Sequence, residues 1–423
     1  MRPQRAVGTN LRDARPGWPS VVVAGAYQTG VVLMRDLRRR GLNVCAFDCY
    51  PDQPGFRTIY GHTYLCPNPD DDPSGWLQFM LQLRADLGHK PVLISSADLF
   101  VTAIGKHAAE LEKHFVFCNA AVAVQALLAT KRRQYDIAAQ HGLPVAKTRF
   151  VGSAGDIAAF IAEASFPCLL KPIHFRDWER VARGHPLYCE KLTLASTPAE
   201  LLEKYELAAQ INPEMIAQEI IQGPDTAKLV YLSCYGLDGR RLGSCVVRQI
   251  RTIPINFGSA SLVEPVDDPE ADAVSDSFLR SVGYAGICEL ELKRDTRDGI
   301  VKLIEANPRY SVTADAAVYA GVELGWLHYL DLIGEHVTPV TPSSRNFRHI
   351  VICRDFGCIG QYRRAGLLTL MGLLKSYRPP VAFFDFDLRD WRVTLDMLIA
   401  QAKRVLYPAY RFFVPKREAA QKS

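Results

Sequence analysis

The chain lacks a hydrophobic run long enough to cross a membrane. A transmembrane helix needs ~20 mostly apolar residues, and no stretch of this sequence approaches that length. The apolar run 21–26 is also too short for the hydrophobic region of a secretory signal peptide. The sequence therefore disfavours membrane-spanning and secreted classes, and we expect a cytoplasmic protein.

Paired cysteines and several catalytic signatures are also missing. The 11 cysteines are odd in number and scattered. No Cys-x-x-Cys pair occurs, so the sequence does not suggest a zinc site. Free thiols of this kind fit a reducing compartment. Neither Gly-x-Ser-x-Gly nor His-Glu-x-x-His occurs, which excludes the usual serine hydrolases and zinc proteases.

Strong charge of either sign is absent too. The 423 residues carry a formal net charge of +5, and 22% of them are charged. This balance is too mild to indicate nucleic-acid binding, although it suits a small anionic substrate. The length and a hydrophobic content of 48% predict a globular protein of two to three domains.

The most informative feature that is present is a pair of acidic segments. Glu289 and Glu291 alternate with apolar residues, and so do Glu305 and Asn307, as in half-buried strands. The connector 294–299 is charged and ends in glycine, so it predicts a hairpin turn. Pairing of the strands would bring these side chains together on one sheet face, about 5 Å apart. Such hard oxygen ligands suit Mg²⁺ that carries nucleotide phosphates, whereas the alternative is a solvated hairpin.

Residues 20–120 predict a small open α/β domain with a parallel sheet, because strands alternate with helical segments. The expected strands are 21–24, 43–48, 92–96 and 115–118. The loop 25–30 lacks the Gly-x-Gly-x-x-Gly fingerprint and the P-loop sequence. Dinucleotide binding with Asp48 on the ribose is therefore disfavoured.

Five motifs follow one another along the chain. They are Thr130-Lys131, Phe166-Pro-Cys-Leu-Leu-Lys171-Pro172, Ile216-Ala-Gln-Glu-Ile-Ile-Gln-Gly223, Gly286-Ile-Cys-Glu-Leu-Glu-Leu-Lys293 and Ile304-Glu-Ala-Asn-Pro-Arg309. In this order and spacing, over roughly residues 20–335, they resemble the ATP-grasp superfamily. Within it the chain is similar to carboxylate–amine ligases of the D-aspartate ligase type. That likeness rests on Ser95-Ser-Ala-Asp98, an insertion with Trp178, and the segment that ends Gln-Gly-Pro-Asp225.

The resemblance implies an ATP-grasp fold of class α/β (α+β). An N-terminal open parallel α/β domain would precede two α+β subdomains that grip ATP, and a helical extension would follow. The expected parts are a disordered leader at 1–19, the N-terminal domain at 20–120, a small subdomain with a lid at 121–215, a large metal-binding subdomain at 216–335, and the extension at 345–423.

The resemblance also assigns roles to residues. The expected metal ligands are Glu291, Glu305 and Asn307, with Glu289 in reserve or paired with a basic residue. The expected nucleotide-binding residues are Lys131, Lys171, Gln218, Glu219, Ile220, Ile221 and Asp225. Among them, Lys131 and Lys171 would contact the phosphates. Residues 218–221 would hold adenine, and Glu219 would bind either the adenine amino group or Lys171. Asp225 would contact the ribose. Arg309, Arg248 and Arg251 are the expected catalytic cations. Solvated surface roles stay open for Lys131, Asp225, Arg248 and Arg251.

The implied cofactors are ATP and Mg²⁺, and Mn²⁺ would also fit. The implied reaction activates a small carboxylate as an acyl phosphate, which an amine then attacks to give an amide, ADP and phosphate. The activated acid would be an amino acid or a similar small acid, and the amine a cell-wall or polysaccharide precursor or a small metabolite. Two alternatives stay open, a carboxylase-like enzyme that activates bicarbonate and a nucleotide-binding regulator without turnover.

Two segments leave further alternatives. Residues 174–191 contain a single glycine, so we expect a mobile lid that uses Arg176, Arg180 and Arg183 or Trp178 rather than a glycine-rich cradle. Residues 391–413 combine basic and aromatic residues on an amphipathic pattern. This helix either packs on the catalytic body or on another subunit of a homodimer, or makes weak peripheral contact with a membrane.

Overall fold

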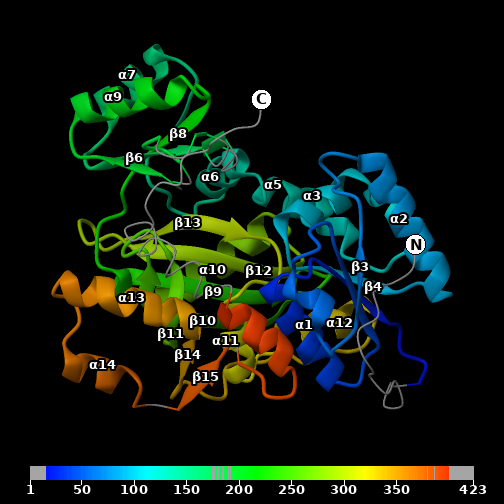
Figure 1. Cartoon of the computed structure of the whole chain (residues 1–423). Coiled ribbons are helices and arrows are strands. Elements are labelled where there is room, and N and C mark those ends of the chain that lie inside the picture. The colour runs from blue at the N-terminus through cyan, green and yellow to red at the C-terminus, as the bar shows by residue number, and fades with distance from the viewer. Residues whose placement is uncertain are drawn as a thin grey trace, which may run out of the picture.

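The structure is a computed structural model, and it describes residues 16–173, 177–178, 181–182, 185–188, 190, 192–378, 380–384 and 386–399. It contains a four-stranded parallel sheet, a four-stranded antiparallel sheet and a seven-stranded sheet, with helices packed around them (Figure 1). The expectations for residues 1–15, for Arg176, Arg180 and Arg183, and for the part of the C-terminal helix beyond residue 399 lie outside the described residues.

The N-terminal domain is the predicted open parallel sheet, with strand order β3-β2-β1-β4. Its elements are β1 (Val21–Ala24), α1 (Gln28–Arg39), β2 (Val44–Asp48), η2 (Pro54–Arg57), β3 (His62–Leu65), α2 (Pro73–Leu87), β4 (Val92–Ser95), α3 (Asp98–Lys106), α4 (Ala108–Leu111), η3 (Asn119–Ala121) and α5 (Val122–Leu128). Both faces of β1 are buried, as in a sheet covered by helices on both sides. The strand predicted at 115–118 is wrong, because only an isolated bridge joins Val92 to Val116.

The ordered body includes part of the predicted leader. Trp18 stacks on Trp326 with ring centroids 5.6 Å apart, and the Tyr329 hydroxyl donates to the Pro19 carbonyl at 2.7 Å. Residues 18 and 19 therefore belong to the folded domain rather than to a disordered segment.

The small subdomain is an antiparallel sheet with strand order β5-β8-β6-β7. Its elements are α6 (Lys131–Gln140), β5 (Thr148–Val151), α7 (Ala154–Glu163), β6 (Cys168–Pro172), β7 (Thr193–Ala195), α9 (Pro198–Ala209) and β8 (Met215–Glu219). Helix α9 begins with an N-cap, because the Thr197 side chain accepts from the Glu200 amide at 3.2 Å. Strand β8 pairs within this sheet, so the small subdomain continues beyond the expected boundary at residue 215.

The large sheet has the strand order β13-β12-β9-β10-β11-β14-β15. Its elements up to residue 332 are η4 (Asp225–Ala227), β9 (Lys228–Tyr235), β10 (Arg241–Ile253), β11 (Ser259–Pro265), α10 (Pro269–Ser281), β12 (Gly286–Arg294), β13 (Val301–Asn307), α11 (Ala314–Tyr319) and α12 (Leu324–Leu332). The predicted acidic hairpin, β12–β13, is present and antiparallel, and β9–β10 form a second antiparallel hairpin. The acidic hairpin is thus at one edge of the largest sheet of the molecule.

The large sheet has two faces with different coverings. Leu290 and Leu292 of β12 pack with Phe278 of α10 on one face. Val230 and Leu232 pack toward α11, α12 and the N-terminal domain on the other face. Because Glu289 and Glu291 alternate with these leucines, they lie on the face shared with Val230 and Leu232.

The C-terminal extension is not only helical, because it adds two strands to the large sheet. Its elements are β14 (Arg348–Ile350), α13 (Ile352–Arg364), α14 (Leu370–Ser376) and β15 (Val381–Phe383). Strand β14 pairs with β11, and β15 pairs with β14. A further helical segment at 391–399 packs Val393 and Met397 against Val31 of α1, so at least one of its faces rests on the body. Among the helices of the described residues, none is long and apolar enough to cross a bilayer.

Candidate functional site

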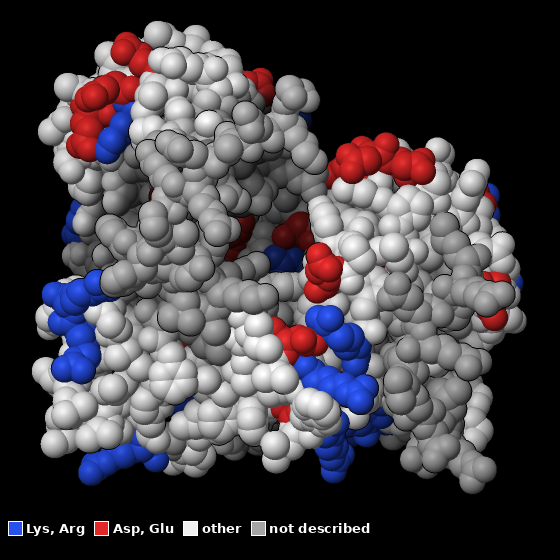
Figure 2. All heavy atoms as spheres, viewed as in Figure 1, with Lys and Arg blue, Asp and Glu red and all other residues white. Residues whose placement is uncertain are grey.

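The acidic hairpin brings its polar side chains together as predicted. In the register of β12 and β13, Glu289 pairs with Asn307 and Glu291 pairs with Glu305. Directly paired residues of antiparallel strands point to the same face. All four side chains therefore line one cavity of about 240 Å³. Figure 2 shows the surrounding hollow between the lobe of the small subdomain and that of the N-terminal domain, with acidic and basic side chains at its floor.

Glu289 has a structural role in this group, and its role as a reserve metal ligand stays a prediction. Its carboxylate accepts hydrogen bonds from Asn307 Nδ2 at 3.0 Å, from Ser311 Oγ at 2.6 Å and from the Thr313 hydroxyl. These contacts use both oxygens and fix the amide of Asn307, so that Asn307 Oδ1 points the other way. Within the described residues the hydrogen-bond donors to Glu289 are one amide and two hydroxyl groups, and the charge of the basic residue Arg309 lies close enough to interact with it.

Glu291, Glu305 and Asn307 Oδ1 then form the oxygen face of the cavity. Within the described residues, no group of three or more His, Cys, Asp or Glu side chains is close enough together to hold a metal ion by itself. Mg²⁺ in nucleotide sites commonly takes only one or two carboxylates and completes its coordination with phosphate oxygens and water. Two carboxylates and an amide oxygen fit that pattern, whereas they do not form a self-sufficient metal cage.

Arg309 is held beside this face by the N-terminal domain. Its Nε and Nη2 atoms donate to the two carboxylate oxygens of Asp98 at 2.7 and 2.9 Å, and Nη2 also donates to Asn307 Oδ1 at 3.1 Å. Burial alone would lower the pKa of Arg309, but Asp98, Glu289 and Glu305 raise it above its ordinary value. The site thus contains a permanent, oriented cation next to the carboxylates.

The opposite side of the cavity is polar and was not predicted. The described residues that contribute polar side chains there are Gln249, Ser259, Ser261, His349 and Arg354. Gln249 is 3% exposed, and within the described chain its Oε1 atom has no hydrogen-bond partner. A buried amide oxygen without a partner costs free energy, so this atom is suited to a ligand or a water molecule.

His349 is fixed by a buried chain of charges. Its Nε2 atom is 2.8 Å from Asp315 Oδ2, and Asp315 Oδ1 accepts from Arg35 Nη2 at 2.8 Å. Arg35 belongs to α1, Asp315 to α11 and His349 to β14. Three segments far apart in the sequence therefore form one rigid wall of the cavity.

Arg248, predicted as a catalytic cation, lies on the wrong face of the sheet. It pairs with Leu229 of β9, which belongs to the face covered by α10, whereas its neighbour Gln249 points into the site. The Nε atom of Arg248 donates to Glu264 at 3.1 Å. The prediction failed because alternation along β10 sends adjacent residues to opposite faces.

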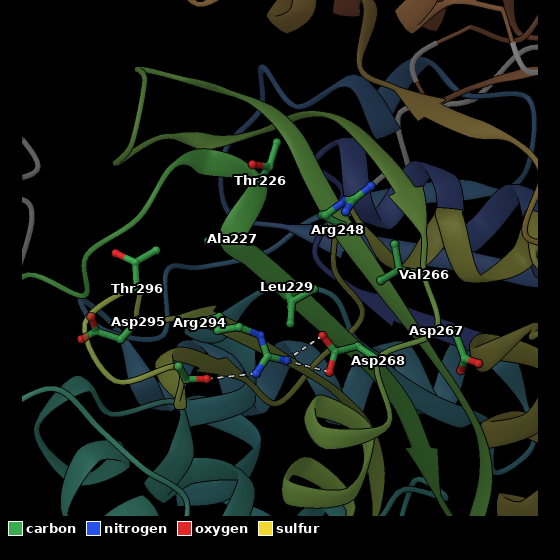
Figure 3. Close-up of a pocket in the computed structure, with 11 residues that line it drawn as sticks. Thr226, Ala227, Leu229, Arg248, Val266, Asp267, Asp268, Arg294, Asp295 and Thr296 are labelled. Atoms are coloured by element: carbon green, nitrogen blue, oxygen red, sulfur yellow. Dashed lines mark hydrogen bonds and ion pairs between the residues drawn. The ribbon is translucent and has the colours of Figure 1, made fainter.

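The cavity that Arg248 does line is larger, at about 480 Å³ (Figure 3). In it Arg294 donates to both carboxylate oxygens of Asp268, at 3.0 and 2.9 Å. This cavity is on the far face of the sheet from Glu291 and Glu305, so we do not consider it the functional site despite its volume.

Arg251, the other predicted catalytic cation, is structural. It is 2% exposed, and its Nε and Nη2 atoms donate to Asp355 of α13 at 2.8 and 2.6 Å. Its Nη1 atom donates to Ser376 Oγ at 3.0 Å. Arg251 therefore fastens the C-terminal extension to β10 instead of facing the cavity.

Lys171 lies on β6 of the small sheet, and its side chain contacts Tyr135, which reaches the acidic hairpin. Its Nζ atom donates to the Tyr135 hydroxyl at 2.9 Å and to Gln218 Oε1 at 3.3 Å. Tyr135 in turn donates to the Ile304 carbonyl of β13 at 2.7 Å, so this tyrosine joins the lysine to the acidic hairpin β12–β13. Lys131 is the first residue of α6, and its side chain lies outside the described part of the structure.

The hinge segment, residues 218–221, is the one predicted to hold adenine, and its contacts differ from that prediction. Glu219 does not hold Lys171, because its Oε1 atom accepts from the Ser165 amide at 2.7 Å and Gln218 takes the lysine. The amides of Glu219 and Ile220 donate to protein carbonyls at 2.9 and 3.2 Å. These two amides are therefore not offered to adenine, and the segment keeps two apolar side chains, the partly exposed Ile220 and the buried Ile221.

Asp225, predicted to meet a ribose, is occupied by the protein. It accepts from the Asn256 amide at 3.1 Å, pairs with Lys228 Nζ at 3.0 Å and accepts from the Tyr362 hydroxyl. Burial opposes ionisation, but Lys228 and these hydrogen bonds lower the pKa of Asp225 below its ordinary value. Asp225 is a buried anchor that joins the hinge to the C-terminal extension.

Lys228 and Lys293 are two buried cations that the sequence did not lead us to predict. They pair across β9 and β12, on the same face as Glu291. Burial and the neighbouring Lys228 lower the pKa of Lys293 to about 8. Their signal in the sequence was present, since Lys293 continues the alternation of Glu289 and Glu291.

Trp178, one of the two predicted lid devices, is fully buried in the core of the small subdomain with Leu187 and Leu201. It therefore anchors the described part of the 174–191 segment to that core.

Comparison with solved structures identifies the architecture. An ADP complex of N5-carboxyaminoimidazole ribonucleotide synthetase aligns with a TM-score of 0.59 and 16% identity, over 82% of this chain and 86% of that one. A biotin carboxylase domain of 2-oxoglutarate carboxylase from Hydrogenobacter thermophilus aligns with a TM-score of 0.59 and 14% identity, over 78% and 73%. The chain has the ATP-grasp fold. The fold class inferred from the five motifs is therefore confirmed.

Sequence comparison finds relatives that are more similar in sequence than these solved structures but align over a smaller part of the chain. It is 25% identical over 274 residues to D-aspartate ligase of Enterococcus faecium, covering 62% of this chain and 63% of that protein. It is 27% identical over 162 residues to formate-dependent phosphoribosylglycinamide formyltransferase of Burkholderia mallei, covering 37% of each. The chain thus spans less than two thirds of the length of these relatives. No model of a protein family matches it.

Proposed function

We propose that this protein is an ATP-dependent carboxylate–amine ligase that forms an amide through an acyl phosphate and releases ADP and phosphate. The observation that carries the proposal is the pairing of Glu291 with Glu305 beside Asn307, on a face that shares one cavity with Arg309. Acyl-phosphate formation requires little covalent chemistry from the protein, but it does require fixed charges around the transferred phosphoryl group.

Glu291, Glu305 and Asn307 would hold Mg²⁺, or Mn²⁺ in its place. The bound ion would neutralise charge on the nucleotide phosphates. Glu289 supports this set by holding Asn307 through a 3.0 Å hydrogen bond, so that the amide oxygen faces the same cavity as the carboxylates. The donor set of two carboxylates and one amide oxygen suits a hard divalent cation that shares its shell with phosphates.

Lys171 would contact the nucleotide from the opposite sheet. Its hydrogen bonds to Tyr135 and Gln218 hold the ammonium group near the hairpin without neutralising it with a carboxylate. Lysine acts at phosphates as a compact point charge, and this arrangement leaves its charge available. Lys131, at the start of α6, would add a second cation.

The acid substrate would occupy the cavity between the carboxylate face and the wall that contains Gln249 and Arg354. A volume of about 240 Å³ suits an amino acid or a similar small acid rather than a large substrate. Arg309 would orient the reacting carboxylate or a phosphoryl oxygen, because Asp98 fixes the direction of its guanidinium fork.

The proposal is tested by trapping the acyl phosphate with hydroxylamine. Amino and hydroxy acids are screened with ATP and Mg²⁺, and formation of an acyl hydroxamate is expected for the true substrate, with ADP as the nucleotide product. Glu305→Gln should abolish this product, whereas the matched substitution Glu270→Gln, at an exposed position in the first turn of α10, should not. Formation of AMP and pyrophosphate would rule out the acyl-phosphate route.

A second candidate function is activation of bicarbonate. It is favoured by the structural likeness to a biotin carboxylase domain whose solved complex contains MgADP and bicarbonate. Incorporation of labelled bicarbonate into an acid-stable product would support this alternative. A chain that binds ATP but turns over no acid or bicarbonate would instead be the nucleotide-binding regulator, although its retained carboxylate pair argues against that.

A further inference from the structure

The C-terminal extension carries an apolar surface that the ligase function does not use. Leu370, Met371 and Leu374 lie on one face of α14, and Leu367 precedes that helix. These four side chains are between 59% and 63% exposed. Scattered exposed leucines are ordinary, but four large apolar side chains within eight residues form a contiguous patch.

Contacts on the opposite side of α14 hold the helix to the protein and leave the patch exposed. Leu368, just before the helix, and Gly372 and Ser376 within it line a cavity with Arg251 and Tyr362. Leu367 and Lys375 also border this cavity while they stay exposed, so they lie between the inner and the outer face. Ser376 also accepts the hydrogen bond from Arg251. The helix is therefore fastened to the sheet by its inner face, and its outer face is directed away from the body.

The charge along the segment that carries the patch has one sign. Between Asp355 and Asp385 the sequence contains no acidic residue, and its cations are Arg363, Arg364, Lys375 and Arg378. All four of these side chains are exposed. Figure 2 shows basic side chains at the lower left corner of the molecule, where Figure 1 places α13 and α14, with no acidic cluster among them.

We propose that the α13–α14 hairpin docks on the surface of an anionic lipid bilayer, with Leu367, Leu370, Met371 and Leu374 inserted at the headgroup boundary. Apolar side chains rimmed by lysine and arginine are the combination that binds such a surface peripherally. Each of the four cations would add attraction to anionic headgroups within a Debye length.

A second copy of the chain is the less suitable occupant. A standard protein interface buries ~800 Å² on each partner, and a patch of four side chains supplies much less apolar area. The four like charges around it would also repel those of a second copy brought face to face, whereas anionic lipids neutralise them.

The test is flotation of the full chain with lipid vesicles. Vesicles of phosphatidylcholine with 30% phosphatidylglycerol are compared with vesicles of phosphatidylcholine alone, at low and high salt. The full chain should float with the anionic vesicles at low salt, and binding should fall at least tenfold with neutral vesicles or at high salt. Absence of flotation with anionic vesicles overturns the proposal.

Variants distinguish the patch from the rest of the surface. The triple change Leu370→Ser, Met371→Ser and Leu374→Ser should reduce vesicle binding about tenfold or more, and Lys375→Glu with Arg378→Glu should do the same. The matched controls are Leu237→Ser, an exposed leucine in the β9–β10 turn, and Lys90→Glu. Undiminished flotation of the triple variant overturns the proposal, because another segment then binds the lipid.

Two further measurements keep that test decisive. Circular dichroism and thermal unfolding establish that the triple variant is folded, since its changes lie on an exposed face. Sedimentation velocity compares the oligomeric state of the variant and the unchanged chain. An unchanged state supports the lipid surface, and a dimer that dissociates in the variant assigns the patch to a second copy instead. Hydroxamate formation in solution is independent of all these outcomes.

Discussion

The guanidinium of Arg309 lies against the carboxylate of Asp98, with donor–acceptor distances of 2.7 and 2.9 Å. Asp98 begins α3 in the N-terminal domain, and Arg309 follows β13 in the large subdomain. This pair therefore makes the N-terminal domain part of the wall of the candidate site, since it orients an arginine that also donates to Asn307.

The first prediction concerns this pair. Asp98→Asn removes the charge and one of the two acceptors, so Arg309 should lose its fixed orientation. We expect kcat/KM for the acid substrate to fall tenfold to a hundredfold, which corresponds to ~1.5–3 kcal/mol of transition-state stabilisation. Hydroxamate formation measures the change, and Asp70→Asn in an exposed loop is the control. An unaltered kcat/KM in Asp98→Asn would mean that the orientation of Arg309 is irrelevant to the reaction.

The second prediction separates two glutamates on the same strand. Glu289→Gln disrupts hydrogen bonds from Ser311, Thr313 and Asn307, so it should lower the free energy of unfolding by ~1–3 kcal/mol. Glu291→Gln should instead raise the Mg²⁺ concentration needed for turnover and cost less stability. Thermal unfolding and a Mg²⁺ titration of activity measure the two effects, and the opposite pattern would exchange the two roles.

The third prediction tests the direction of adjacent side chains on β10. Gln249→Leu removes the amide that faces the cavity, so KM for the acid substrate should rise about tenfold, the usual value of one well-placed hydrogen bond. Arg248→Gln, on the far face, is the matched control and should leave KM unchanged. A larger effect from Arg248→Gln would show that the functional cavity is on the face drawn in Figure 3.

The fourth prediction concerns pH. His328 of α12 is buried, and burial lowers its pKa to about 4. Between pH 6.5 and pH 4 the unfolded chain binds a proton that the folded chain does not, so stability falls as the pH drops through this window. The contribution is fully present above pH 6.5, and its loss amounts to about 3 kcal/mol at the acid end.

The leucine variant isolates that contribution. His328→Leu should flatten the decline in unfolding free energy between pH 6.5 and pH 4, as measured by denaturant titration at several pH values. His336→Leu, at an exposed position, should leave the decline as it is. Equal slopes for the unchanged chain and His328→Leu would refute the assignment.

The parts of the site that the sequence predicted are local. Glu289, Glu291, Glu305 and Asn307 belong to one hairpin, and a strand period of two is enough to put them on one face. The order of the five motifs was enough to predict the fold. Each motif occurs on the strand or at the helix start that the ATP-grasp resemblance assigns to it.

The contacts that the sequence did not predict are long-range ones. The partner of Arg251 is Asp355, 104 positions away, and that of Arg309 is Asp98, 211 positions away. A sequence pattern contains no signal for such pairs. The shift in register between Gln249 and Arg251 also breaks the alternation on β10, so counting positions from Arg248 could not give the direction of Arg251.

The central claim is that the side chains of Glu291 and Glu305 bind a divalent cation together with a nucleotide. Electron paramagnetic resonance of Mn²⁺, titrated with the protein in the presence of ATP, measures that ternary binding directly. We predict tight binding by the unchanged chain and by Glu270→Gln, and a loss of at least tenfold in Glu291→Gln and in Glu305→Gln. Equal Mn²⁺ and ATP binding by all four proteins would contradict the account.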